Sequence, residues 1–161
     1  AMVDSQHDLP VVTASPAELE SDIAPFRTLN WAPVGMTAHI VYTAWDETRP
    51  ASLSPRVIQG VIREMIGFDG LLMSDDVDMK ALKGTAVENA IAVVEAGCDL
   101  ALNCFGVMAD MTAIADALPE ISDAARERLA RAMATVSAGP DDWSLQRALA
   151  TRDMLLQQGI A

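Results

Sequence analysis

The chain has 161 residues, of which 51% are hydrophobic and only 4% aromatic, a composition that fits one globular domain with an aliphatic core. Its net charge of −12 argues against nucleic acid and anionic membranes as partners, because an acidic surface repels both. No apolar run approaches the roughly 18 residues of a membrane-spanning helix, and the N-terminal residues carry no signal-peptide pattern.

The first predicted helix covers residues 16–29. Residues 15–18 (Ser-Pro-Ala-Glu) form a capping box with proline at the first helical position, which is typical of a helix start. The apolar run over residues 34–42 then predicts a buried strand that ends near His39.

A second helix is predicted from Ser54-Pro55 to Gly67, and a short apolar strand over residues 70–73 runs into Ser-Asp-Asp at residues 74–76. The apolar face of that helix consists of Val57, Ile58, Val61, Ile62, Met65 and Ile66.

The second half of the chain continues the alternation of helix and strand. Residues 85–88 (Thr-Ala-Val-Glu) form another capping box and start a helix that ends at Gly97, and residues 99–103 form a third strand. Further helices are predicted over residues 108–118, 122–136 and 141–157, with a break at Gly139-Pro140 and a cap at Asp141-Asp142.

This alternation predicts an α/β fold with right-handed crossovers and a parallel sheet that is covered on both faces. Three parallel strands leave two open edges and half a core. We therefore expect the chain to be part of a larger unit, or to be completed by another chain.

Reactive groups in parallel α/β folds gather where strands end, and here the second strand ends in two adjacent acids. Asp75 and Asp76 point in different directions in an extended chain, so one can face a pocket while the other binds backbone N–H groups. The alternative is that both acids are caps or loop ligands.

Other polar residues at strand ends have two interpretations each. His39 can face a pocket or be satisfied by neighbouring backbone, and Asn103 can be a pocket amide or a turn former. On composition alone, Asp4, His7 and Asp8 form an ordinary exposed N-terminal segment.

The two cysteines, Cys98 and Cys104, lie in or beside apolar segments and are expected to be free thiols. This fits a reducing compartment and predicts a cytoplasmic protein. No metal-binding spacing accompanies them, so we expect neither a metal nor another cofactor.

Several motifs, taken in order, resemble one enzyme family. Residues 36–42 (MTAHIVY), 50–54 (PASLS), 67–79 (GFDGLLMSDDVDM) and 95–100 (EAGCDL) are similar to the β-N-acetylhexosaminidases of glycoside hydrolase family 3. These enzymes trim N-acetylglucosamine in peptidoglycan recycling. The resemblance covers residues 3–133.

The resemblance implies a (β/α)8 TIM barrel of which this chain supplies the last three strands and forms a single partial domain. Residues 1–33 would hold the acid/base loop and a helix, residues 34–107 the three strands, and residues 108–161 the C-terminal helices. The expected partners are a carbohydrate substrate and an N-terminal half-barrel chain or a homo-oligomer mate that closes the sheet.

The resemblance also implies roles for individual residues. Asp75 would be the nucleophile of a retaining mechanism, and Asp4 the aspartate that pairs with an acid/base histidine. In this chain Gln6 stands at the histidine position and cannot titrate, which leaves His7 as a possible substitute. The residues expected to contact the sugar are Met36, His39 and Asp76.

Two other functions are kept beside this one. The chain can be a catalytically inactive half-barrel that binds sugar or oligomerises, which the glutamine at position 6 favours. It can also be an unrelated barrel enzyme acting on phosphorylated substrates, although no glycine-rich phosphate loop precedes a helix.

Overall fold

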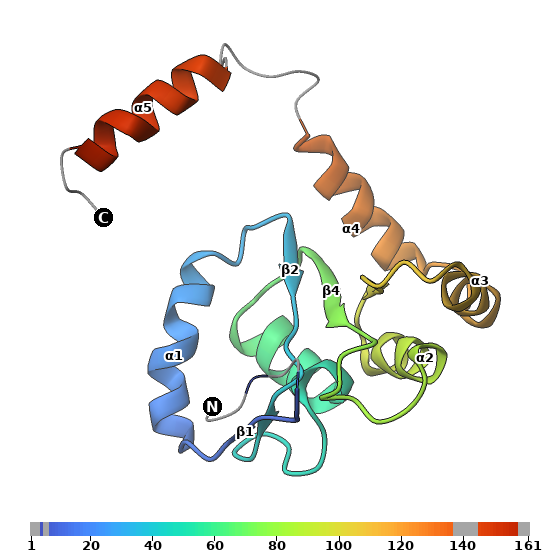
Figure 1. The fold of residues 1–161 in the computed structure, drawn as a ribbon. Helices are drawn as coiled ribbons and strands as arrows, with labels where there is room; N and C mark the ends of the chain where they lie inside the picture. Colours follow the sequence, from blue (N-terminus) through green and yellow to red (C-terminus); the bar gives the residue numbers. More distant parts are fainter. Residues whose placement is uncertain (1–3, 5–6, 137–144, 158–161) are drawn as a thin grey trace.

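A computed structural model describes residues 4, 7–136 and 145–157 of the chain (Figure 1). Its main sheet has three parallel strands in the order β2-β4-β5, with the longest strand in the middle. These strands are β2 (Val34–Met36), β4 (Leu71–Asp76) and β5 (Leu100–Leu102). The parallel α/β arrangement predicted from the alternation of elements is confirmed.

The prediction of a single strand over residues 34–42 is wrong, because the chain leaves the main sheet after Met36. Its last part is a separate strand, β3 (Val41–Tyr42), which pairs in parallel with β1 (Val11–Val12) in a second, two-stranded sheet. His39 lies between the two segments, and its ring turns inward to bond Ser52 and the end of β4. This inward turn divides one apolar run between two sheets.

Both predicted capping boxes are confirmed. They start helices α1 (Pro16–Thr28) and α2 (Ala86–Ala96). The side chains of Ser15 and Thr85 accept a backbone N–H of the first turn, and a glutamate carboxylate in that turn accepts the backbone N–H of each capping residue. Gly97 ends α2 with φ 115°, a left-handed conformation that glycine adopts without strain.

The second predicted helix forms, but with a wider winding than expected. After a 3-10 turn η1 (Ala51–Leu53), the segment η2 (Arg56–Met65) is a π-helix, whose wide turn is visible in the bond from Ile66 N–H to the carbonyl of Val61 (2.8 Å). Three members of its predicted apolar face are buried, whereas Met65 is 42% exposed. Met65 therefore does not join the core, which the other members of this face contact.

The remaining helices are α3 (Met108–Ala117), α4 (Asp123–Ala134) and α5 (Leu145–Gln157), close to their predicted ranges. In Figure 1, α5 stands apart from the sheet and its helices. The predicted break at residues 139–140 and the cap at residues 141–142 lie outside the described residues. None of the helices in the described part of the chain is long and apolar enough to cross a bilayer.

The main core lies where the sheet meets η2 and α2. Its buried side chains include Ile58, Leu72 and Val93, and Phe68 packs its ring against two glycines of the sheet. A methyl group at Gly70 would come within 2.4 Å of the Ala32 carbonyl oxygen and 2.5 Å of the Phe68 ring. Glycine is therefore required where β4 begins.

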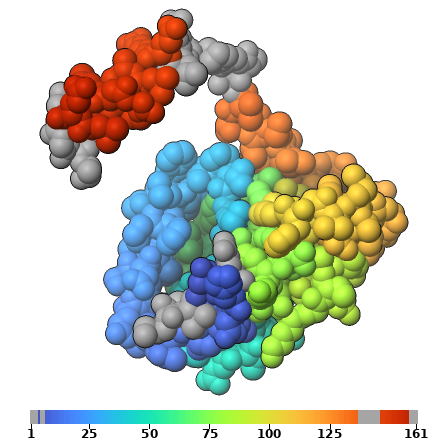
Figure 2. Space-filling model, viewed as in Figure 1, coloured from blue at the N-terminus to red at the C-terminus, as the bar shows by residue number. Residues whose placement is uncertain are grey.

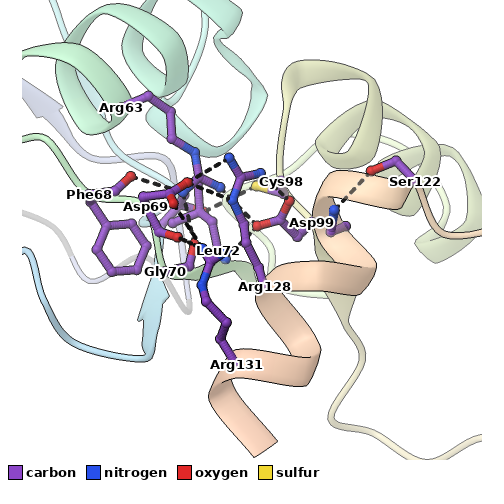
Figure 3. A network of polar contacts seen from close by, with 12 residues as sticks. Arg63, Phe68, Asp69, Gly70, Leu72, Cys98, Asp99, Ser122, Arg128 and Arg131 are labelled. Atoms are coloured by element: carbon purple, nitrogen blue, oxygen red, sulfur yellow. Dashed lines mark hydrogen bonds and ion pairs between the residues drawn. The ribbon is translucent and has the colours of Figure 1, made fainter.

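A network of arginines and aspartates ties α4 to the amino ends of β4 and β5 (Figure 3). The carboxylate of Asp99 accepts bonds from Arg63 (2.8 Å), Arg128 (3.0 Å) and the Leu72 N–H (2.8 Å). Arg128 and Arg131 of α4 also bind Asp69. This network lies at the end of the sheet opposite to the predicted site.

Candidate active site

The carboxyl ends of the three parallel strands lie together, as expected for a parallel sheet. His39, which follows β2, donates from Nε2 to the carbonyl of Asp76 at the end of β4 (2.9 Å). Cys104, which follows β5, donates its backbone N–H to Asp76 Oδ1 (3.1 Å). Asp76 is thus the point at which all three strand ends are joined.

A β-bulge lies between Met73 and Asp76 near the end of β4. Met73 pairs with Leu100 and Asp76 pairs with Leu102, so β4 contains one residue more than β5 over this stretch. The buried hydroxyl of Ser74 accepts the Leu102 N–H (3.1 Å) and satisfies a donor at the bulge. Bulges of this kind re-aim side chains beside active sites.

The two acids have different surroundings. Asp76 is only 7% exposed, and its Oδ1 accepts the N–H groups of Asp78 (3.3 Å) and Cys104 (3.1 Å). Asp75 is half-buried, and its Oδ1 accepts the N–H of Asp76 (2.8 Å). Asp76 therefore has the backbone-binding position, while Asp75 is the more accessible carboxylate.

His39 is completely buried, with both ring nitrogens engaged inside the protein. Nε2 bonds the carbonyl of Asp76 (2.9 Å), and Nδ1 lies 2.6 Å from the hydroxyl of Ser52. A carbonyl oxygen can only accept, so Nε2 carries the hydrogen, and the Ser52 hydroxyl donates to Nδ1 in the neutral ring. This geometry favours the interpretation of a satisfied histidine and leaves no ring nitrogen for a substrate.

The other polar residues at the strand ends differ in exposure. Met36 is 56% exposed at the end of β2. Both amide atoms of Asn103 are buried, and neither has a hydrogen-bond partner within the described residues. Asn103 therefore makes no turn-forming bond in this part of the structure.

Both cysteines are free thiols, as predicted. Burial raises the pKa of the Cys98 thiol to about 11, and its sulfur lies 3.9 Å from the hydroxyl of Thr37. Cys104 is exposed beside the acids, and its pKa is raised by desolvation and by the charges of Asp76 and Asp75. Only Cys104 is open to reagents in the folded chain.

Asp4, His7 and Asp8 of the N-terminal loop are exposed, and β1 follows the loop. The N–H groups of His7 and Asp8 bond the carbonyl of Asp4, and Val41 N–H bonds the carbonyl of Pro10 (2.9 Å). Figure 2 shows this dark blue segment on the face of the molecule between α1 and the green segment that follows β4.

Of the predicted acid/base residues, Asp4 and His7 are described by the structure. Gln6 lies outside the described residues. Among those that are described, no hydrogen bond or ion pair joins His7 to Asp75 or Asp76, and no group of three or more His, Cys, Asp or Glu is placed to hold a metal.

Sequence reasoning missed two serines that shape the site. Ser52 holds the ring of His39, and Ser74 satisfies the bulge. Ser52 belongs to one of the family-like motifs, at residues 50–54, but nothing in its spacing shows that its hydroxyl meets a histidine from another segment.

Comparison with known sequences points to one family. Residues 1–137 match the model of the glycosyl hydrolase family 3 N-terminal domain. A β-hexosaminidase of Chromobacterium violaceum is 38% identical over 160 residues, which cover 96% of this chain and 43% of that protein. A β-hexosaminidase of Bordetella avium is 35% identical over 89% of this chain and 41% of its own length. The chain thus spans less than half the length of these relatives.

Solved structures agree with this result. A family 3 β-N-acetylglucosaminidase from Paenibacillus sp. FPU-7 superposes with a TM-score of 0.69 at 29% identity, covering 89% of this chain and 32% of that one. NagZ from Neisseria gonorrhoeae, in complex with N-trifluoroacetyl-D-glucosamine, gives a TM-score of 0.66 at 33% identity, covering 80% and 38%. The parallel strands and flanking helices described above are therefore part of a (β/α)8-type barrel.

Proposed function

Since this chain belongs to glycosyl hydrolase family 3, we propose that it contributes the nucleophile to a β-N-acetylhexosaminidase that removes terminal β-linked N-acetylglucosamine. The observation that carries the proposal is the position of Asp75. It is the accessible acid at a bulged strand end, and its neighbour Asp76 is fixed by the other two strand ends. The reaction is proposed to retain the anomeric configuration.

The proposed chemistry follows from the two oxygens of Asp75. Oδ1 accepts the N–H of Asp76, so Oδ2 is the oxygen that attacks the anomeric carbon. The bond to the leaving-group oxygen breaks as the glycosyl–aspartate ester forms, and a general acid protonates that oxygen. Water then attacks the anomeric carbon from the face opposite to Asp75, the bond to Asp75 Oδ2 breaks and frees its carboxylate, and the same acid/base group takes the proton of the water.

The acid/base step is assigned to the N-terminal loop, with Asp4 as the orienting carboxylate. Gln6 occupies the position where a histidine is expected and cannot exchange a proton. We assign the proton transfer to His7, which is exposed one residue further along the same loop.

We further propose that residues 1–161 form one partial barrel domain, divided into the loop and helix (1–33), the strand region (34–107) and the C-terminal helices (108–161). A preceding half-barrel segment, or a second copy of the chain, closes the sheet. Two free thiols support a cytoplasmic location, where peptidoglycan fragments are the proposed substrates.

The test of this function is Asp75→Asn in a completed barrel, made by joining the chain to the preceding segment of the Chromobacterium violaceum relative. Asparagine keeps the shape of Asp75 but is a poor nucleophile, so kcat/KM for an aryl N-acetylglucosaminide should fall at least about 10³-fold. Initial rates and trapping of the glycosyl–enzyme by mass spectrometry check this. If turnover were unchanged in Asp75→Asn, Asp75 would be excluded as the nucleophile.

An inactive, sugar-binding half-barrel is the second candidate, because Gln6 does not titrate. The same completed barrel distinguishes the two candidates through a substrate with a poor leaving group, which needs acid assistance more than an aryl glycoside does. If the barrel hydrolyses a disaccharide and His7→Gln abolishes that hydrolysis, the result supports the proposed enzyme activity. Binding of N-acetylglucosamine without turnover, with turnover gained in Gln6→His, supports the inactive form.

A further inference from the structure

We propose that His39 is a positioning residue that fixes the direction of the Asp75 carboxylate through the backbone of Asp76, and that couples it to the N-terminal loop. The proposal rests on the function proposed above and extends it to a residue that touches no substrate. The juxtaposition that carries it is a fully buried imidazole between a strand end and a serine.

The first step is the fixation of Asp76. Its carbonyl accepts from His39 Nε2 (2.9 Å) and from Met79 N–H (3.2 Å), and its carboxylate accepts from Cys104 N–H (3.1 Å). The Asp76 N–H in turn donates to Asp75 Oδ1 (2.8 Å). A rotation of Asp76 therefore moves the donor that orients the nucleophile.

The second step is the fixation of His39 itself. The hydroxyl of Ser52 holds Nδ1 at 2.6 Å, and Ser52 N–H bonds the carbonyl of Ala38 (3.2 Å). Ser52 is completely buried, so no water competes for these bonds. The ring is thus locked in one tautomer and one orientation.

The third step connects the ring to the loop proposed to carry the acid/base group. Val41 follows His39 by two residues, and its N–H bonds the carbonyl of Pro10 (2.9 Å), while Thr43 N–H bonds the carbonyl of Val12 (3.0 Å). The N-terminal loop and the end of β4 are therefore both attached to the segment that His39 anchors. We infer that this buried ring sets the separation of Asp75 from the acid/base group of the loop, which act on the same glycosidic bond.

The test is a pair of substitutions in the completed barrel, each of which keeps one of the two ring bonds. In His39→Gln the amide nitrogen reaches the position of Nε2 and keeps the donor to Asp76. In His39→Asn the amide reaches only the position of Nδ1, so the bond to Ser52 is kept and the bond to Asp76 is lost. Both variants lose one buried hydrogen bond and should be destabilised to a similar extent.

We expect His39→Asn to lower kcat roughly 100-fold with little change in KM, because small displacements of a reacting group are costly. The kcat of His39→Gln should be at least about tenfold higher than that of His39→Asn. Equal kcat in the two variants, or losses that follow the unfolding midpoint alone, would overturn the proposal.

A second pair of variants covers the case in which His39→Asn does not fold. Ser52 and Ser54 are both buried serines of the same segment, but Ser52 bonds His39 whereas Ser54 bonds Asp46 (2.7 Å). Ser52→Ala should lower kcat and Ser54→Ala should not, although both remove a buried hydroxyl. A loss of kcat in both, or in neither, contradicts the proposal.

A readout without turnover separates this proposal from the proposed function. Desolvation and the charges of Asp76 and Asp75 raise the pKa of the Cys104 thiol, so the pH dependence of its alkylation by iodoacetamide responds to the position of these carboxylates. His39→Asn should shift the pKa of Cys104, and His39→Gln should leave it unchanged. An inactive wild-type barrel rejects the function alone, whereas an unshifted Cys104 pKa in His39→Asn rejects the role of His39.

Discussion

Asp46 shows how a buried carboxylate contributes a pH-dependent part of the stability. It is 8% exposed, and burial alone would raise its pKa. Hydrogen bonds from Ser54 Oγ, Thr48 N–H, Thr48 Oγ1 and Arg49 N–H favour the charged form more strongly, and they lower the pKa from 3.8 to about 2. Asp46 thus fixes the turn that leads from β3 toward η1.

The lowered pKa of Asp46 predicts when this stabilisation is lost. The folded pKa lies below the unfolded value, so the contribution is complete above pH 3.8 and disappears as the pH falls toward 2. The difference corresponds to about 2 kcal/mol in the free energy of unfolding. Urea unfolding between pH 5 and 2.5 should show a steeper loss in the wild type than in Asp46→Asn. Asp22→Asn, at an exposed site on α1, is the control and should keep the wild-type slope.

At the level of single residues, the sequence predicted which side chains lie at the carboxyl ends of the strands, but not which hydrogen bonds they form. Strand ends in a parallel sheet must lie on one edge, so the meeting of His39, Asp76 and Cys104 was foreseeable. A His39 satisfied by neighbouring backbone was one of the two interpretations of the sequence, and its bond to the Asp76 carbonyl agrees with it. Its bond to Ser52 was not foreseeable, because the periodicity of the sequence does not show the backbone path of that segment.

At the level of elements, the arginine network attaches both η2 and α4 to the amino ends of β4 and β5, through ion pairs that differ in burial. The side chains of Arg63 and Asp99 are 10% and 5% exposed, whereas those of Arg131 and Asp69 are 54% and 72% exposed. A buried carboxylate that loses one partner is left incompletely compensated, while an exposed ion pair contributes little.

Two matched substitutions test this difference in attachment. Arg63→Met should lower the free energy of unfolding by about 3 kcal/mol, because the buried Asp99 loses one of its three donors and the carbonyls of Phe68 and Gly70 lose the Arg63 donor. Arg131→Met should cost less than about 1 kcal/mol. Chemical denaturation followed by circular dichroism measures both values, and similar losses for the two variants would refute the assignment of Asp99 as the anchor.

Helix starts were the most predictable elements because their signals are local. Ser15 and Thr85 each carry the complete capping pattern within four residues, and both caps form as predicted. The two-residue strands β1 and β3 depend on a pairing between segments that are distant in sequence. An apolar run shows that a segment is buried, but it does not show where the segment changes its pairing partner.

At the level of the whole molecule, the three-stranded sheet is incomplete on both sides within the described residues. Leu71 N–H bonds the carbonyl of Pro33, and Thr37 N–H bonds the carbonyl of Met73, so the alternate residues Val34 and Met36 direct their backbone groups to the open edge of β2. Large apolar side chains are exposed at Val34, Met36, Phe105, Val107 and Met108. Further strands beside β2 and β5 would cover the open edges and complete the barrel that the relatives share.

The chain purified alone should therefore hydrolyse no aryl N-acetylglucosaminide, and activity should appear only when the preceding half-barrel segment is supplied. Val34→Pro removes an outward N–H from the open edge of β2 without removing a bond to β4, so it should leave the chain folded and reduce this gain of activity. Gly35→Pro is the contrast, because it removes an N–H directed at β4 and should unfold the sheet. Turnover by the isolated chain at the rate of the completed barrel, lost in Asp75→Asn, would show that the three strands suffice.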